Sequence, residues 1–313
     1  MGNSKSILKD TYLYFFSKLI PGIAGISFLI LLTRKIGLSE FGVYSLYFSQ
    51  CNLIVSFCFG WLNQSELRYS TLPKSYNRPS HHILVLICLT MCFSIVFLLN
   101  QLDKYSTSSM FFSLYCIFSI GIFTYVKTLY QSQILPKKVL VLTNFQSLLF
   151  LIFPFLADLY FDVSSNLLLI STGSSFLLAS LIIFFDKKFT EIIKIKFSYS
   201  NILKWLKFGI PVSIWSSLGL LLHYLDRFFI NNYLDTINLG VYSTISEISI
   251  RIFSFLIFPI TLAVHPRITK LWNEDKKLEA FTLINKSVNI IFLVLLIIGL
   301  IIKIFNNLFF SIL

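Results

Sequence analysis

Four polar residues recur about one helical turn apart inside the apolar block at residues 239–264. They are Ser243, Glu247, Arg251 and Ser254, and this spacing places them on one face of a helix. Arg251 lies near the middle of the block, where a charge in a membrane-spanning helix costs about 3 kcal/mol on insertion scales. Two interpretations follow: Arg251 faces a cavity that binds an anion, or it forms a self-neutralised structural pair with Glu247.

The block at residues 42–62 carries a counterpart polar stripe. Its members are Ser45, Ser49, Asn52 and Ser56. The two blocks also share a short sequence, because Gly42–Ser45 (Gly-Val-Tyr-Ser) recurs as Gly240–Ser243, and each copy follows a block with an early proline. This repeat predicts two halves related by a pseudo-twofold axis along the membrane normal, with the two stripes as walls of one cavity between them.

Other charged residues inside apolar blocks are further candidates. His223, Asp226 and Arg227 share a helix face near the outer end of their block. They form either a protonatable coupling site or a structural group in which Arg227 extends to the lipid headgroups. Lys18 and Lys127 are weaker candidates for cavity cations, and Lys18 reaches the cytoplasmic surface easily.

The elements that must position these residues are membrane-spanning helices. Of the 313 residues, 56% are hydrophobic and only 13% are charged, against about 25% charged in soluble domains. The apolar residues come in blocks of about twenty, the length that crosses a bilayer. Nine blocks are expected to span, at residues 12–32, 42–62, 83–100, 109–130, 140–157, 165–185, 206–230, 239–264 and 287–305. The sequence therefore predicts an all-α polytopic membrane protein.

The distribution of basic residues predicts the orientation. Although the net charge is +12, the Lys and Arg residues lie in short loops, which argues against nucleic acid as a partner. With the amino terminus in the cytoplasm, most loop cations are cytoplasmic, and Arg34, Lys35 and Lys104 are the exceptions. The positive-inside rule thus favours a multi-pass inner-membrane protein with a cytoplasmic amino terminus.

Soluble chemistry is not expected. The loops are too short to hold a soluble active site, and no catalytic signature occurs, so we predict that the protein is not an enzyme. The five cysteines lie inside apolar blocks without metal-ligand spacing, so we expect no metal site.

The repeat also predicts the domain organisation. Residues 1–200 are expected to form a first lobe of six helices. Residues 201–313 are expected to form an incomplete, truncated second lobe that contains spans seven to nine and the start of a tenth, because Phe111–Leu114 at the start of span four is similar to Phe309–Ile312 near the carboxyl end.

Several segments resemble one known family. They are Leu31–Gly37 with Phe41–Ser45, Asp226–Ile230 with Leu239–Ser243, and His265–Ile268. These segments are similar to those of the Wzx-type polysaccharide flippases, which transfer O-antigen and other oligosaccharide repeat units, within the superfamily that also holds lipid II flippases and MATE drug exporters. The resemblance covers essentially the whole chain and implies a two-lobe helical bundle around a cationic cavity.

The resemblance further implies the function and its residues. The substrate would be an undecaprenyl-pyrophosphate-linked oligosaccharide for lipopolysaccharide or other surface polysaccharide, moved by alternating access. Arg251, Glu247, Lys127, Lys18 and Asn52 would line the substrate cavity. Three further residues would couple or gate transport: His223, Asp226 and Arg227. No cofactor is implied beyond a coupling ion, H⁺ or Na⁺; the partners would be the lipid-linked oligosaccharide, membrane lipids and other polysaccharide-assembly membrane proteins.

Three alternatives remain open. Another exporter of the same superfamily, for lipid II or drugs, shares the architecture, although a drug exporter is expected to favour acidic cavity residues. A membrane glycosyl polymerase or transferase would carry a large outer loop, which this sequence lacks. A truncated membrane scaffold without transport activity is the third.

Overall fold

The described part of the chain is helical. The computed structural model describes residues 20–30, 33–69, 81–101, 107–133, 135–161, 164–185, 199–251, 268, 271 and 275–304. Its main elements are α2 (Leu38–Tyr69), α3 (His81–Gln101), α4 (Thr107–Ser132), α5 (Pro136–Tyr160), α6 (Ser165–Ser180), the 3₁₀ helix η1 (Leu181–Phe185), α8 (Tyr199–Tyr233) and α10 (Lys277–Ile304). Residues 20–30, 33–36 and 236–251 are helical as well, and the described residues contain no strand.

Local sequence signals explain where some of these helices begin. Pro136 lies in the first turn of α5, where its missing N–H is not needed by the helix. Ser164 caps α6 by accepting a hydrogen bond from the backbone of Leu167. The Glu40 carboxylate of α2 also accepts a 2.7 Å hydrogen bond from the backbone N–H of Ser165. The beginnings of α2 and α6 are thereby tied together.

Six described helices are long and apolar enough to cross a membrane, namely α3, α4, α5, α8, α10 and α6 with the start of η1. They coincide with six of the nine predicted spans. α2 is long but falls outside this group, because its polar stripe lowers the mean hydropathy. The spans expected at residues 12–32 and 239–264 are described only in part, as helices over 20–30 and 236–251. A multi-pass helical membrane protein is therefore confirmed.

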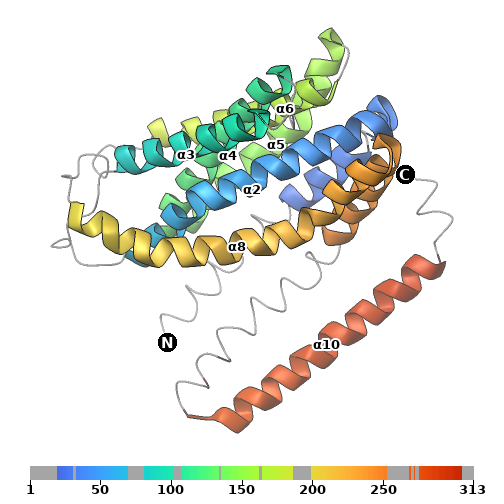
Figure 1. Ribbon diagram of the computed structural model, residues 1–313. Helices are drawn as coiled ribbons and strands as arrows, with labels where there is room; N and C mark the ends of the chain where they lie inside the picture. Colours follow the sequence, from blue (N-terminus) through green and yellow to red (C-terminus); the bar gives the residue numbers. More distant parts are fainter. Residues whose placement is uncertain are drawn as a thin grey trace. The chain divides into compact units, whose positions relative to one another are not determined.

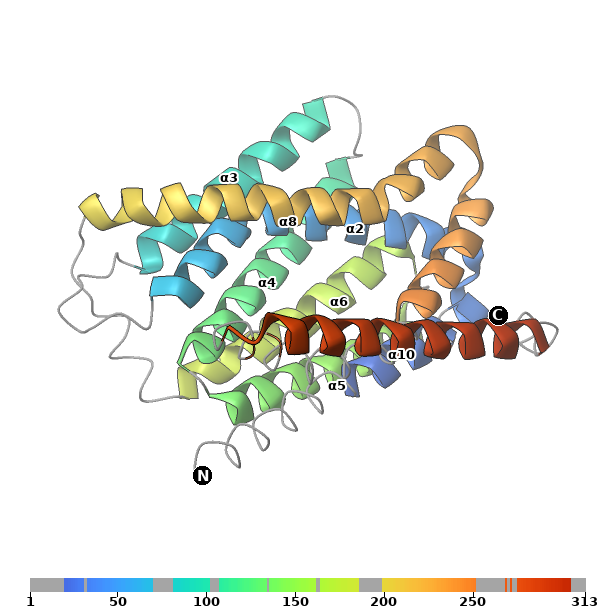
Figure 2. The ribbon, with the colours of Figure 1, turned by 90° about the horizontal axis from the view of Figure 1, so that it is seen from below.

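Two compact units make up the molecule, one of residues 36–243 and one of residues 1–35 with 244–313. In the larger unit α2 is the central helix, and it packs against α8, α4, α3 and α6. Figures 1 and 2 show α2 and α8 side by side along much of their length. These units are defined by how compactly the residues pack and not by the sequence repeat. The lobe boundary expected near residue 200 therefore stays a prediction.

Small residues allow α2 and α8 to approach closely. A Cβ atom on Gly60 of α2 would lie 2.5 Å from the hydroxyl oxygen of Ser213 on α8. Ser213 donates to the backbone carbonyl of Ser56 at 3.0 Å, and Ser65 donates to that of Trp205 at 2.8 Å. Packing through small residues and interhelical hydrogen bonds is typical of membrane helices, since lipid offers no hydrophobic driving force between them.

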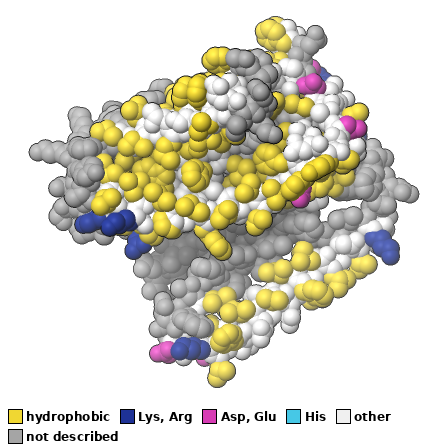
Figure 3. Space-filling model, in the orientation of Figure 1, with side chains coloured by type: hydrophobic (Ala, Val, Ile, Leu, Met, Phe, Trp, Pro, Cys, Tyr) yellow, Lys and Arg dark blue, Asp and Glu magenta, His cyan; other side chains and the backbone are white. Residues whose placement is uncertain are grey.

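The outer surface is apolar. Figure 3 shows hydrophobic side chains over most of the described surface that faces the viewer, with the charged side chains toward its edges. Exposed large hydrophobic residues include Leu86 and Leu98 on α3 and Trp215 and Leu222 on α8. Such a surface would aggregate in water and suits contact with lipid chains.

Candidate functional site

The repeated motifs pack directly on each other. The Ser45 hydroxyl donates to the Ser243 hydroxyl at 2.7 Å, and these two residues are separated by 198 positions in sequence. A Cβ atom on Gly42 would lie 2.7 Å from the backbone nitrogen of Gly240, so the two helices touch through their backbones. The contacts are also reciprocal, since a Cβ atom on Gly42 would meet the carbonyl of Thr236 and one on Gly240 would meet that of Leu38, 198 positions before Thr236. Reciprocal contacts of this kind are those of a twofold interface. A local pseudo-twofold axis therefore runs between Gly42 and Gly240 and between Ser45 and Ser243.

Arg227 lies next to this contact between the two motifs and is buried. Only 2% of the residue is exposed. Its Nη1 donates to the Ser49 hydroxyl at 2.7 Å and to the Ser45 carbonyl at 3.3 Å. The guanidinium carbon also lies 5.0 Å from the centre of the Tyr224 ring. Arg227 thus links α8 to α2, and the alternative in which it extends to the lipid headgroups is wrong.

The neighbours of Arg227 point elsewhere. Asp226 is exposed, and one of its carboxylate oxygens accepts a 2.5 Å hydrogen bond from the Tyr242 hydroxyl. His223 is exposed, and its ring packs edge-on against Tyr224, with the ring centres 5.1 Å apart. The structure does not bring the three side chains together; it places Asp226 and Tyr242 in one contact and Arg227 in another.

Arg251 and Glu247 form an ion pair in the smaller unit. Arg251 Nη2 lies 3.5 Å from Glu247 Oε2, and the two side chains are 28% and 22% exposed. The guanidinium also lies against Gly25 of the helix at 20–30, and a Cβ atom at Gly25 would overlap it. Arg251 Nε is buried and makes no hydrogen bond with any described residue. The pair is therefore long and partly open, with one buried donor unused.

The remaining predicted residues have simpler environments. Asn52 is half-buried and donates to the Phe48 carbonyl of its own helix at 2.8 Å. Lys127 is half-buried on α4. Lys18 lies outside the described residues, as does Ser254. No three His, Cys, Asp or Glu side chains come together as metal ligands anywhere in the described ranges.

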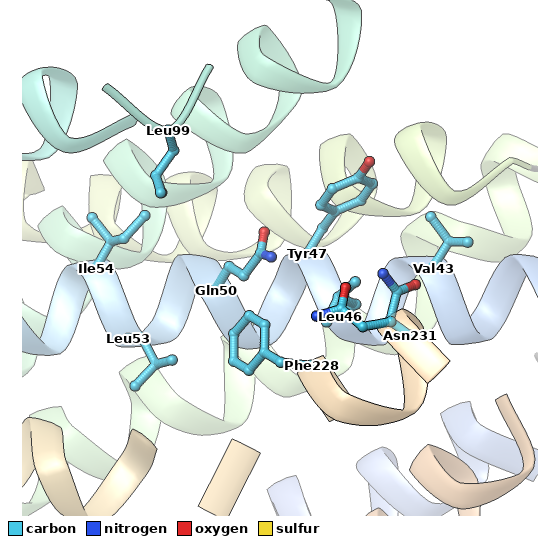
Figure 4. A pocket seen from close by; sticks show the side chains of 10 residues that line it. Val43, Leu46, Tyr47, Gln50, Leu53, Ile54, Leu99, Phe228 and Asn231 are labelled. Carbon is cyan, nitrogen blue, oxygen red and sulfur yellow. The ribbon is translucent and has the colours of Figure 1, made fainter. Parts of the chain in front are cut away.

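A cavity of about 460 Å³ opens between α2, α3 and α8. Its lining consists of Val43, Leu46, Tyr47, Gln50, Leu53, Ile54, Leu99, Phe228, Asn231 and Asn232. Figure 4 shows Tyr47 and Gln50 on α2, Phe228 and Asn231 on α8, and Leu99 across the space on α3. None of the ten lining residues is charged. The cavity therefore suits a ligand with uncharged apolar parts and groups that accept hydrogen bonds.

Sequence reasoning missed two features. Glu66 is only 1% exposed, and its Oε1 accepts a 3.2 Å hydrogen bond from the Ser132 hydroxyl of α4. The span expected at residues 42–62 ends before Glu66, whereas α2 continues to Tyr69. At 100° per residue Glu66 lies off the face that carries Ser45, Ser49, Asn52 and Ser56, so the stripe provided no signal for it. The cavity residues on α8 gave none, because exposed Asn residues at a helix end are common.

Comparison with protein families decides the class of this chain. Residues 7–272 match the family model described as "Polysaccharide biosynthesis protein". The chain belongs to this family. A comparison with curated proteins finds no significant match. Among solved structures, a chain of "Crystal structure of MATE in complex with MaD5" is similar, with a TM-score of 0.54 and 15% sequence identity over 96% of this chain and 74% of that one.

The family and the fold have clear functional consequences. At 15% identity the solved structure shows a shared fold and nothing more. The polysaccharide biosynthesis family and the MATE fold are those of transporters and not of enzymes. This member of the family is therefore a multi-pass membrane protein of the flippase or exporter type.

Proposed function

We propose that the protein transfers an undecaprenyl-pyrophosphate-linked oligosaccharide from the cytoplasmic to the outer face of the inner membrane, for O-antigen or other surface polysaccharide assembly. The observation that carries this proposal is Arg251, a partly exposed guanidinium in the apolar block at residues 239–264 of a polysaccharide biosynthesis protein. A pyrophosphate must leave water to cross the bilayer, and a fixed cation offsets that cost. Arginine suits the task because its planar guanidinium binds phosphate oxygens in pairs.

Glu247 gives Arg251 a replaceable partner. At 3.5 Å the ion pair is longer than a strong charge-assisted hydrogen bond, which is about 2.8 Å. An incoming pyrophosphate would displace the carboxylate and use the buried Nε of Arg251 as well. Lys127, Lys18 and Asn52 are proposed as weaker contributors to the substrate path.

Coupling to an ion gradient is assigned to the outer end of α8. Asp226 is exposed, and its hydrogen bond from Tyr242 would be weakened by protonation or by Na⁺. His223 is exposed near the same end of α8, and its imidazole can both accept and donate a proton. In this proposal Arg227 holds the outer end together while Asp226 and His223 exchange the coupling ion, H⁺ or Na⁺.

Restoration of a surface glycan in a flippase-deficient strain tests the function. Arg251→Ala should abolish glycan display while the protein remains in the membrane, and Arg251→Lys should restore part of it. Lys286→Ala, which removes an exposed cation on α10, is the matched control and should keep full display. Full activity of a Glu247→Ala, Arg251→Ala double variant would show that the pair is structural and would refute this function for Arg251.

The proposed orientation has its own test. The five native cysteines are all buried, so an impermeant thiol reagent should give little background. Cysteines introduced at Leu234 and Lys137, both exposed, lie on opposite sides in this topology. The reagent applied outside should label position 234 and miss position 137, and the opposite pattern would reverse the topology.

A further inference from the structure

The cavity between α2, α3 and α8 continues into an apolar groove. A second hollow of about 280 Å³ lies between the same three helices. Its lining consists of Leu53, Ile54, Phe57, Ile95, Ile214, Ser217, Leu218 and Leu221. Leu53 and Ile54 line both hollows, so the two are adjacent parts of one groove. Ser217 provides the single hydroxyl that lines the second hollow. This hydroxyl lies 3.1 Å from the Ser56 hydroxyl and is hydrogen-bonded to it.

Polarity changes along this groove. One end carries the Tyr47 phenol and the amides of Gln50, Asn231 and Asn232, whereas the other end is lined by aliphatic side chains and Phe57. The side-chain amides of Asn231 and Asn232 are exposed, so their N–H groups are accessible to a ligand. A groove that is apolar at one end and rich in neutral donors at the other fits an amphipathic ligand.

The length and direction of the groove match a lipid in one leaflet. The lining runs from Val43 to Phe57 on α2, which is about 21 Å at the helical rise per residue. This is more than half of a hydrocarbon core about 30 Å thick. In the proposed topology the amide end is nearer the outer surface and the apolar end extends toward the midplane, as the head and tail of an outer-leaflet lipid do.

The lining of the apolar hollow favours a single branched chain. Eight residues on α2, α3 and α8 line it, and seven of them are apolar. A glycerolipid carries two chains side by side, whereas a polyprenyl lipid carries one. The side chains that line the hollow, largely Leu and Ile, are themselves methyl-branched and can interdigitate with the methyl groups of a polyprenyl chain.

We propose that this groove binds the polyprenyl chain of the transported lipid after its head has reached the outer side, with the phosphate end at Gln50, Asn231 and Asn232. The inference rests on the proposed function and adds a second, product-side site to it. Neutral amide and phenol donors hold a phosphate less tightly than a guanidinium does, because their hydrogen bonds lack the charge. The product would therefore leave this site for the bilayer more easily than it leaves Arg251.

Photolabelling tests the groove directly. The full chain is placed in phosphatidylglycerol vesicles with a polyprenyl pyrophosphate that carries a photoreactive group near the end of a short chain, and the labelled peptides are mapped. Label should appear on α2 near Phe57 and on α8 near Leu218. Unlabelled polyprenyl pyrophosphate should compete. Inorganic pyrophosphate should not, because it lacks the chain.

Matched substitutions on α8 give the control. Leu218→Trp fills the apolar hollow and should lower labelling by about tenfold, through loss of the apolar area that the chain would bury. Leu222→Trp adds the same side chain one turn away, outside the groove, and should leave labelling unchanged. Both positions are exposed, at 50% and 72%, so neither variant should impair folding. Equal labelling of Leu218→Trp and the parent protein would overturn the proposal.

The head position is tested separately from the chain. Asn231→Leu removes an amide donor and should weaken competition by polyprenyl pyrophosphate several-fold while leaving competition by the uncharged polyprenol unchanged. Equal weakening of both would overturn the assigned head position. Competition by added lysophosphatidylglycerol that equals that of polyprenyl pyrophosphate would make the groove a general lipid site and overturn the inference. Such a result would leave the Arg251 complementation test, and hence the proposed function, standing.

Discussion

Arg227 and Arg251 both lie in apolar blocks of the sequence, but the surroundings of their guanidinium groups differ. Arg227 is buried, and a hydroxyl and a carbonyl of α2 accept its hydrogen bonds. Arg251 is partly exposed, faces a carboxylate at 3.5 Å and has a buried Nε without a partner in the described chain. Neutral acceptors hold a cation in place, but they include no anionic group that an anionic ligand could replace. A long pair with a carboxylate leaves the cation available for exchange, so of these two arginines Arg251 is the one that we propose binds the transported anion.

The largest expected effect on stability is at Arg227. Arg227→Ala should remove two charge-assisted hydrogen bonds between α8 and α2 and leave a cavity, with a loss of about 3 kcal/mol or more. The variant protein should be depleted from membranes and unfold at a lower temperature in detergent. Arg251→Ala should lose about 1 kcal/mol or less, because its pair is partly exposed. Equal losses of stability in the two variants would show that the two arginines do not differ in their structural roles.

The next effect concerns the glycine contact at the pseudo-twofold axis. Gly240→Ala should cost about 1–3 kcal/mol, because a Cβ atom there would overlap the backbone of Leu38 and backbone atoms cannot move aside easily. Gly219→Ala on α8 is the control, since a Cβ atom there meets nothing within 4 Å. Thermal unfolding in detergent should separate the two variants; unchanged stability of Gly240→Ala would argue against the close contact.

A glycine also sharpens the assignment of Arg251. Gly25→Ala should displace the guanidinium and reduce glycan display about tenfold, comparable with weakening one good ionic contact by about 1.4 kcal/mol. Gly22→Ala, one turn earlier on the same helix, adds a methyl group with nothing within 4 Å and should keep full display. Arg251→Lys combined with Gly25→Ala should recover part of the activity, because the ammonium is more compact. Equal glycan display by Gly25→Ala and Gly22→Ala would show that the close contact between Gly25 and Arg251 is unimportant for activity.

The smallest effect on stability is expected at Asp226. Asp226→Asn keeps an oxygen that can accept from Tyr242 at an exposed site, so the change should be below about 1 kcal/mol. If Asp226 exchanges the coupling ion, transport measured in vesicles should lose its dependence on the imposed ion gradient. Retained dependence in Asp226→Asn would assign coupling to another group.

The helices and their polar faces were predictable because membrane spans are encoded locally, by runs of apolar residues and by spacing. The predicted stripe of Ser45 and Ser49 is present on α2, but the sequence could not say what covers it. The stripe was predicted to line a cavity, but at these two residues it is covered by packed side chains. Ser243 contacts Ser45, and Arg227 contacts Ser49. Which helices become neighbours depends on tertiary packing over long sequence separations, and single-residue patterns do not contain that information.

The cavity between α2, α3 and α8 shows the same limit. Gln50 and Asn231 are far apart in sequence and belong to no recognisable motif, yet they line one space. Glu66 was overlooked for a different reason, since a charge near the end of an apolar block looks like a loop residue when the helix continues beyond the block. The resemblance to polysaccharide flippases, carried by short segments around the repeated motif, was confirmed at the level of the family.

The contact between the two motifs has a consequence for divergence after duplication. A residue on the axis faces its own counterpart, so Gly42 and Gly240 share one space, as Ser45 and Ser243 share one hydrogen bond. A larger residue at Gly42 would overlap the backbone of Thr236 and Gly240, and one at Gly240 would overlap the backbone of Leu38, so no change of a neighbouring side chain could relieve the overlap. Positions away from the axis face unrelated residues and can drift in one copy alone. The two copies would therefore retain the glycine and the serine of the motif at the axis while the flanking sequence diverged.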